Sequence, residues 1–207
     1  NAPLTATDDT ISITSSTSLT DGASGYLVAS GLALKGSGSV TLDNALNDVV
    51  TIAAGSDDNS AIGALSFTNK DALTVGTVNP TGISSTGQIK LETLTGDLTV
   101  SQDISTTSTS SDAIILNAGK STSVFDNKGG DVRVVDSSNI SAGSGGLIKI
   151  FTGSAINSIG TSEIVDNEYA GYDETSELPS LSSGSKNLFY REEVVTTNNS
   201  LYFDVND

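Results

Sequence analysis

The stretch SVTLDNALNDVVTIAAGSDDNSAIG, residues 39–63, is followed directly by two variations on its own pattern. These are ALSFTNKDALTVGTVNPTGISSTG at 64–87 and QIKLETLTGDLTVSQDISTTSTSSD at 88–112. Each unit opens with two apolar residues on either side of a polar one, which is the alternation of a β-strand and not the three- and four-residue spacing of a helix. The pattern persists to Ile150, so residues 40–150 organise the chain.

Two strands are expected in every unit. The first strand has inward pairs that begin 25, 24, 25 and 34 residues apart, at Val40/Leu42, Leu65/Phe67, Ile89/Leu91, Ile114/Leu116 and Ile148/Ile150. The second has pairs at Val50/Ile52, Leu73/Val75, Leu98/Val100 and Val132/Val134. The fourth unit is longer only between its two strands, which indicates an insertion at residues 121–130.

Self-similarity at a fixed period is typical of a solenoid, in which one repeat cannot bury its own apolar face and must stack on the next. Successive strands of the same sense then pair in parallel, about 4.8 Å apart. The sequence therefore predicts an all-β fold, a right-handed parallel β-helix with 24–25 residues per regular coil.

Three regions are expected along the chain. Residues 1–38 predict an irregular first coil or N-terminal cap, residues 39–165 the β-helix repeats, and residues 166–207 an acidic loop followed by an aromatic tail. In this tail, NLFYREEVV and SLYFDV predict two strands, as a hairpin or as extended arms. Its aromatic side chains are expected either to plug the end of the core or to dock a neighbouring subunit.

Composition excludes several classes of function. The chain has 207 residues, a net charge of -16, and no Cys or His. Without these two residue types there is no Ser-His-Asp or Cys-His catalytic group and no disulfide framework. The negative charge repels nucleic acid, and no apolar run is long enough to insert into a membrane. The N-terminal NAPLTATDD lacks the features of a signal peptide, so we expect an internal or processed fragment.

Catalysis by carboxylates needs an acidic pair on one face of the coils. The charged residues expected at outward positions are instead scattered, at Lys90, Glu92, Arg133 and Lys149. We therefore expect no enzyme activity, and we assign no catalytic, cofactor-binding or metal-binding residue and no cofactor.

Two polar columns are predicted along the stack. One acid precedes the second strand of each coil, at Asp48, Asp71, Asp97 and Asp131. Stacked carboxylates suit calcium, but aspartates at turns also cap their own backbone, and this second interpretation is favoured. The other column is expected at Asn44, Asn69, Thr93, Ala118 and Thr152 and is structural, with an interruption at Ala118.

The repeats TGDLTVSQDIST (95–106) and GGDVRVVDSSNISAGSGG (129–146) resemble those of filamentous haemagglutinin-like adhesins, which bacteria export by two-partner secretion. NLFYREE (187–193) is similar to an aromatic FYRE-type segment of such surface proteins. The resemblance covers residues 40–165 and, more loosely, the tail. The amino-terminal secretion domain of these adhesins is not recognisable in this chain.

This resemblance implies a secreted protein of the bacterial cell surface that acts in cell adhesion and biofilm formation. Its expected partners are a host or neighbouring-cell surface, a glycan or the extracellular matrix. The expected role is a rigid extracellular stalk for attachment or aggregation. The alternative is a homopolymer, a self-assembling filament or biofilm-matrix subunit joined through β-helix ends or exchanged terminal strands.

Overall fold

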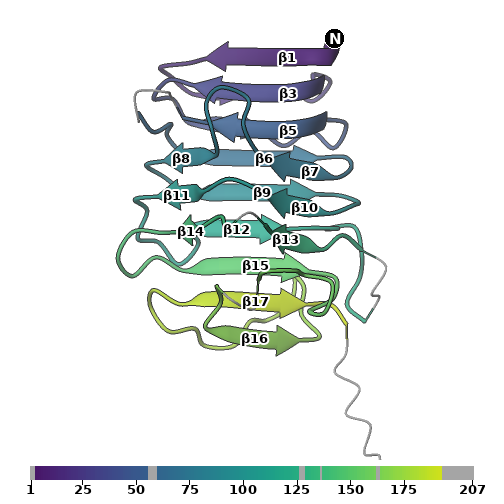
Figure 1. The fold of residues 1–207 in the computed structure, drawn as a ribbon, viewed down its shortest axis with the longest axis vertical. Coiled ribbons are helices and arrows are strands. Elements are labelled where there is room, and N and C mark those ends of the chain that lie inside the picture. Colours follow the sequence, from purple (N-terminus) through teal and green to yellow (C-terminus); the bar gives the residue numbers. More distant parts are fainter. Residues whose placement is uncertain (1–2, 56–59, 126–128, 136, 162–163, 193–207) are drawn as a thin grey trace, which may run out of the picture.

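The computed structural model describes residues 3–55, 60–125, 129–135, 137–161 and 164–192. It is an all-β parallel solenoid of about 7 turns, as the sequence predicts (Figure 1). In the described ranges, no helix is long and apolar enough to cross a membrane. The strands are β1 (Leu4–Thr14), β2 (Leu19–Thr20), β3 (Leu27–Lys35), β4 (Val40–Leu42), β5 (Asp48–Ala54), β6 (Leu65–Asn69), β7 (Leu73–Val75), β8 (Ile83–Ser85), β9 (Ile89–Thr93), β10 (Leu98–Val100), β11 (Ile104–Thr106), β12 (Ile114–Asn117), β13 (Val132–Val134), β14 (Ile140–Ser141), β15 (Ile148–Thr152), β16 (Asn167–Ala170) and β17 (Lys186–Tyr190).

The five predicted first strands, β4, β6, β9, β12 and β15, belong to one eight-stranded parallel sheet, here called sheet B, in the order β16-β17-β15-β12-β9-β6-β4-β2. Their register is the predicted one, because Val40, Leu65, Ile89, Ile114 and Ile148 lie directly above one another. Eight strands at about 4.8 Å spacing make a stack roughly 34 Å long. The repeat pattern was therefore sufficient to predict the register of these strands.

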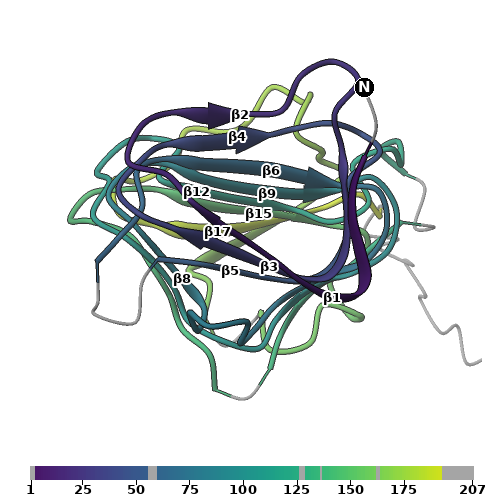
Figure 2. The ribbon, with the colours of Figure 1, turned by 90° about the horizontal axis from the view of Figure 1, so that it is seen from above.

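The second, nine-stranded sheet, sheet A, divides as the coils proceed. β1, β3 and β5 are long strands, and β3 and β5 lie across the coil from the strands of sheet B (Figure 2). β5 then pairs with both β7 and β8 (Figure 1). The loop 76–82 separates these two short strands. Gly82 in this loop has φ +65 and leaves no room for a Cβ beside the carbonyl of Asp103, so glycine is required there.

A third short strand in each later coil is absent from the two-strand prediction. These strands are β8, β11 and β14, which stack in register through Ile83, Ile104 and Ile140. Each contributes one fully or nearly fully buried isoleucine to the core. A single apolar residue shows no alternation, and this explains why periodicity did not reveal the strand.

The predicted inward pair Val50/Ile52 is wrong at its first member. Val49 is buried, whereas the Val50 side chain is 60% exposed. The inward positions of β5 are three residues apart at this corner, so strict alternation fails between Val49 and Ile52. The other three second-strand pairs are buried as predicted.

The two ends of the stack differ. At the C-terminal end, Ile164 and Val165 pack against the core, and the N–H of Val134 in β13 donates to the carbonyl of Ile159 (2.8 Å). At the N-terminal end, no described strand lies beyond β1 in sheet A (Figure 1). Side chains thus cover the core at the C-terminal end, where β16 is the edge strand of sheet B, and the N-terminal end is open.

Candidate functional site

A column of buried polar side chains runs along the corner between the two sheets. Asn47, Asn69, Thr93 and Thr152 are fully buried there. Asn69 Oδ1 accepts a hydrogen bond from the N–H of Val49 (2.8 Å), and Thr152 Oγ1 accepts one from the N–H of Val132 (3.0 Å). Each side chain satisfies a backbone group of a neighbouring coil that would otherwise be buried without a partner. The column therefore supports the corner.

This column corrects the predicted one at Asn44 and explains the interruption at Ala118. Asn47, not Asn44, has the buried position, and its Oδ1 accepts from the N–H of Leu27 (2.9 Å). Beside Ala118, the buried guanidinium of Arg191 donates through Nη2 to the carbonyls of Ala118 (2.6 Å) and Gly130 (3.0 Å). An arginine from outside the repeats thus compensates for the missing side chain.

The predicted aspartate column is not one cluster. Lys70 Nζ lies 3.9 Å from a carboxylate oxygen of Asp48 and 3.3 Å from one of Asp71, while Arg133 Nε lies 3.0 Å from Asp97. In the part of the chain that the structure describes, no group of three or more Asp, Glu, His or Cys residues is placed to hold a metal ion. Neighbouring cations and backbone groups compensate these acids.

Asp131 and Asp71 differ in electrostatics. Burial raises the pKa of Asp131, and the Asp97 carboxylate adds to this, although the N–H of Ser154 donates to it (2.8 Å). A hydrogen bond from Thr95 Oγ1 (2.8 Å) and the nearby Lys70 lower the pKa of Asp71. Ionisation of Asp131 therefore destabilises the folded state, whereas ionisation of Asp71 stabilises it.

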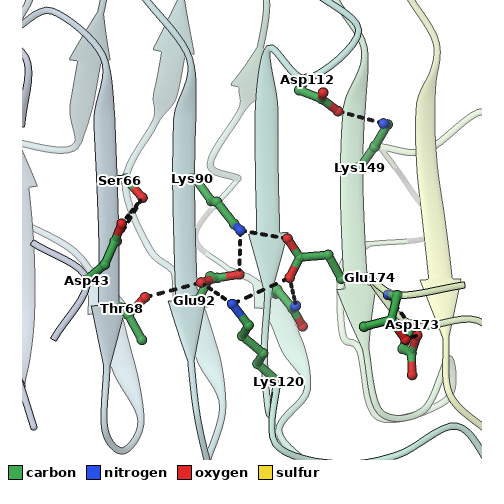
Figure 3. Close-up of polar contacts among 12 residues, drawn as sticks. Asp43, Ser66, Thr68, Lys90, Glu92, Asp112, Lys120, Lys149, Asp173 and Glu174 are labelled. Carbon is green, nitrogen blue, oxygen red and sulfur yellow. Dashed lines mark hydrogen bonds and ion pairs between the residues drawn. The ribbon is translucent and has the colours of Figure 1, made fainter. Parts of the chain in front are cut away.

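The segment 171–185, here called the strap, connects β16 to β17 and reaches across the outer face of sheet B. Its Glu174 lies 2.6 Å from Lys90 Nζ and 3.7 Å from Lys120 Nζ (Figure 3). Both lysines also pair with Glu92, at 3.0 and 2.8 Å. The sequence predicted that Lys90 and Glu92 are scattered charges, and this is wrong. They belong to a network of two lysines and two glutamates.

This network fastens the strap. The Glu92 side chain is only 4% exposed, and Asn117 Nδ2 donates to Glu174 Oε2 (3.0 Å). The other predicted outward charges lie apart from it, since Arg133 pairs with Asp97 and Lys149 with Asp112 (2.6 Å). Burial opposes ionisation of Glu174, but its bonds to Lys90 outweigh this and lower its pKa.

Aromatic rings stack under the strap. The Phe189 ring lies between Phe151 and Tyr169, with centroids 5.0 and 5.1 Å away, and Tyr172 meets Phe189 edge-on. Of this strand, Leu188 enters the main core and Tyr190 packs against it. Phe189, Tyr169 and Tyr172 therefore cover the outer face of sheet B and do not plug the core, whereas docking of a neighbouring subunit stays a prediction. The predicted strand SLYFDV lies outside the described residues.

The insertion contributes an exposed aromatic side chain. Phe125 is 67% exposed, and its N–H donates to the carbonyl of Arg191 (2.7 Å). Residues 126–128 of this insertion lie outside the described part. Phe125 is therefore a candidate binding residue, because it exposes apolar area on a loop, where binding residues are common.

The open N-terminal end has an apolar mouth. A cavity of about 230 Å³ leads toward the core between β1 and β2 and is lined by Leu4, Ile13, Leu19, Thr20, Asp21, Gly25, Tyr26, Leu27 and Leu42. The adjacent edge strand β1 has a register shift between Ala6 and Thr10 that contains the exposed Asp8 and Asp9. Bulges and charges of this kind hinder the addition of another strand.

Comparison with protein-family models, with curated proteins and with solved structures finds no match to this chain. Its function is therefore argued from the fold and these surfaces.

Proposed function

We propose that this chain is a rigid segment of a secreted bacterial cell-surface protein and that it serves attachment to a host or neighbouring-cell surface, a glycan or the matrix. The observation that carries the proposal is the uninterrupted parallel stack itself. Its register holds from β4 to β17, so the coils form one stiff unit. Together with the resemblance of its repeats to haemagglutinin-like adhesins, this supports a stalk that presents side chains on its loops.

The outward positions of the strands suit an extracellular surface. Thr51, Thr74, Thr99 and Arg133 follow one another on sheet A, and none of them is apolar. Their short polar side chains and the net charge of -16 favour solubility of a long stalk. Contact with a partner is then expected at loops, where Phe125 offers exposed apolar area.

Attachment is tested with beads that carry the protein at a defined density. The beads are applied to epithelial cells, to bacterial cells and to immobilised glycans, and the bound beads are counted after washing. Phe125→Ser is compared with Val50→Ser, because both side chains are exposed but lie on different parts of the coil.

We expect the wild-type beads to bind at least one of these surfaces above beads coated with an unrelated acidic protein. Phe125→Ser lowers the binding several-fold and Val50→Ser leaves it unchanged. Equal retention of wild-type and acidic control beads on all three surfaces argues against an attachment role. Binding that neither substitution alters keeps the role and places the contact elsewhere.

Self-assembly is the second candidate, and the apolar mouth at the N-terminal end favours it. A second copy stacked there buries the exposed Leu4. Two features oppose an open-ended filament. Ile164 and Val165 cover the apolar core at the other end, and the shared negative charge, with Asp8 and Asp9 on the edge strand β1, repels a second copy.

A further inference from the structure

We infer that residues 153–161 and 164–192 form a locked end cap, which prevents the coils from peeling off at the C-terminal end, so that the solenoid unravels from its N-terminal end. In a plain solenoid each repeat contacts only its neighbours, and the terminal repeats open most easily. The C-terminal end departs from this arrangement in three ways.

The first departure is the strand order. β16 precedes β17 in the chain, yet β17 lies between β15 and β16 in sheet B. The register along β17 is continuous on both sides, since Phe189 is opposite Phe151 in β15 and opposite Tyr169 in β16. The last described strand is therefore an interior strand, and its release breaks two ladders of hydrogen bonds instead of one.

The second departure is Arg191, which directly follows β17. Its main-chain N–H bonds Thr152 of the adjacent coil (3.1 Å), but its side chain reaches one coil further, to the carbonyls of Ala118 and Gly130. The side chain is 1% exposed. Main-chain and side-chain donors of Arg191 thus tie the end of β17 to two preceding coils, and removal of the guanidinium takes one hydrogen-bond donor away from each of two buried carbonyls.

The third departure is the strap. From the turn after β16 it reaches Lys90 in β9, three positions before β17 in sheet B. Tyr172, Leu178 and Leu181 pack against Ile115, Phe151 and Phe189 on the same face (Figure 3 shows the ionic part). Peeling of β17 therefore also requires the loss of contacts to β9 and β12.

The N-terminal end has no comparable fastening in the described residues. β1 is mostly exposed, pairs only with β3, and contributes only Ile11 to the buried core. The free energy of local opening is consequently expected to be lower at β1 than at β17.

Hydrogen–deuterium exchange of the full chain, followed by peptide mass spectrometry, measures this directly. In the wild type we expect amides of β15 and β17 to exchange more slowly than those of β1 and β3. Arg191→Met, which keeps the aliphatic length but no donor, is compared with Arg133→Met at the partly exposed arginine of β13. The first substitution speeds exchange in β12, β15 and β17 by roughly tenfold or more and leaves β1 unchanged, because a buried charged hydrogen bond is lost. The second has little effect on any of these strands.

Equal exchange of β1 and β17 in the wild type, or equal profiles of the two arginine variants, overturns the inference. If Arg191→Met does not fold, Glu174→Gln against Glu177→Gln gives the same comparison at the strap. Faster exchange in β17 and β9 only in the Glu174 variant supports the lock, and indistinguishable profiles contradict it.

Discussion

Single buried polar side chains decide whether the corner of each coil is stable. Asn69 illustrates this, because its amide accepts from the N–H of Val49 and donates to the carbonyls of Val49 (3.0 Å), Asp71 (3.1 Å) and Ala72 (3.0 Å). No apolar side chain can replace these bonds. A repeat of this kind thus depends on polar residues inside as well as apolar ones.

We predict that Asn69→Ala lowers the free energy of unfolding by about 2–4 kcal/mol, since several buried backbone groups lose their partner. Urea denaturation followed by circular dichroism measures the change. Asn157→Ala, at an exposed turn position, is the control and is expected to have almost no effect. A loss at Asn69 no larger than that at Asn157 contradicts the supporting role of the column.

The shifted pKa values of Asp131 and Asp71 predict whether replacing each aspartate raises or lowers the unfolding temperature. The raised pKa of Asp131 means that its ionisation destabilises the folded state, and this cost develops as pH rises above the ordinary value of 3.8. Asp131→Asn is therefore expected to unfold at a higher temperature than the wild type at pH 7, with the difference vanishing near pH 3.

Asp71 is the control for Asp131, because its pKa is shifted in the opposite direction. Its pKa is lowered, so its stabilising contribution is present above pH 3.8 and is lost as pH falls through the folded value. Asp71→Asn is expected to lower the unfolding temperature slightly at pH 7. If both variants shift the unfolding temperature in the same direction, these electrostatic assignments are wrong.

At the scale of the element, the direction in which a side chain points from its strand decides how much it stabilises the fold. Val49 and Val50 are adjacent and chemically identical, but only Val49 faces the core. We predict that Val49→Ala costs about 2 kcal/mol of unfolding free energy and Val50→Ala less than about 0.5 kcal/mol. Denaturant titration of the two variants measures both values, and the reverse order is incompatible with the position of β5.

The strap gives a second prediction for an element. The lowered pKa of Glu174 means that its contribution is complete above about pH 4.5 and disappears as pH falls through the folded value. Glu174→Gln is expected to destabilise the protein by about 1–3 kcal/mol at pH 7 and to match the wild type near pH 3. Thermal unfolding across this range, with Glu177→Gln as the neutral control, tests it. If the unfolding temperatures of Glu174→Gln and the wild type still differ at pH 3, the effect comes from packing and not from the charge of Glu174.

The elements also show where sequence reasoning succeeds. Strands with two inward residues, such as β6 and β9, were predicted with their register because alternation fixes which side chains face inward. The strap network was not predicted, since Lys90 and Glu174 are far apart in sequence and only the return of the chain across sheet B brings them together. Arg191 was predicted to lie in a tail strand, and nothing in the sequence indicated that its side chain donates to the carbonyl of Ala118.

At the scale of the whole molecule, the proposed attachment role predicts a finite stack that does not build a fibre. One end is open and carries acidic edge residues, while at the other Ile164 and Val165 cover the core and β16 is the edge strand of sheet B. Head-to-tail growth needs a strand of one end to pair with a strand of the other, and the net charge of -16 with the exposed Asp8 and Asp9 on β1 opposes this pairing.

Sedimentation velocity of the full chain over a hundredfold range of concentration tests this claim most directly. The account predicts one monomeric species of 207 residues, or at most a dimer formed at the open ends. A series of larger species that grows without limit as the concentration rises contradicts it and identifies the chain as the subunit of a filament.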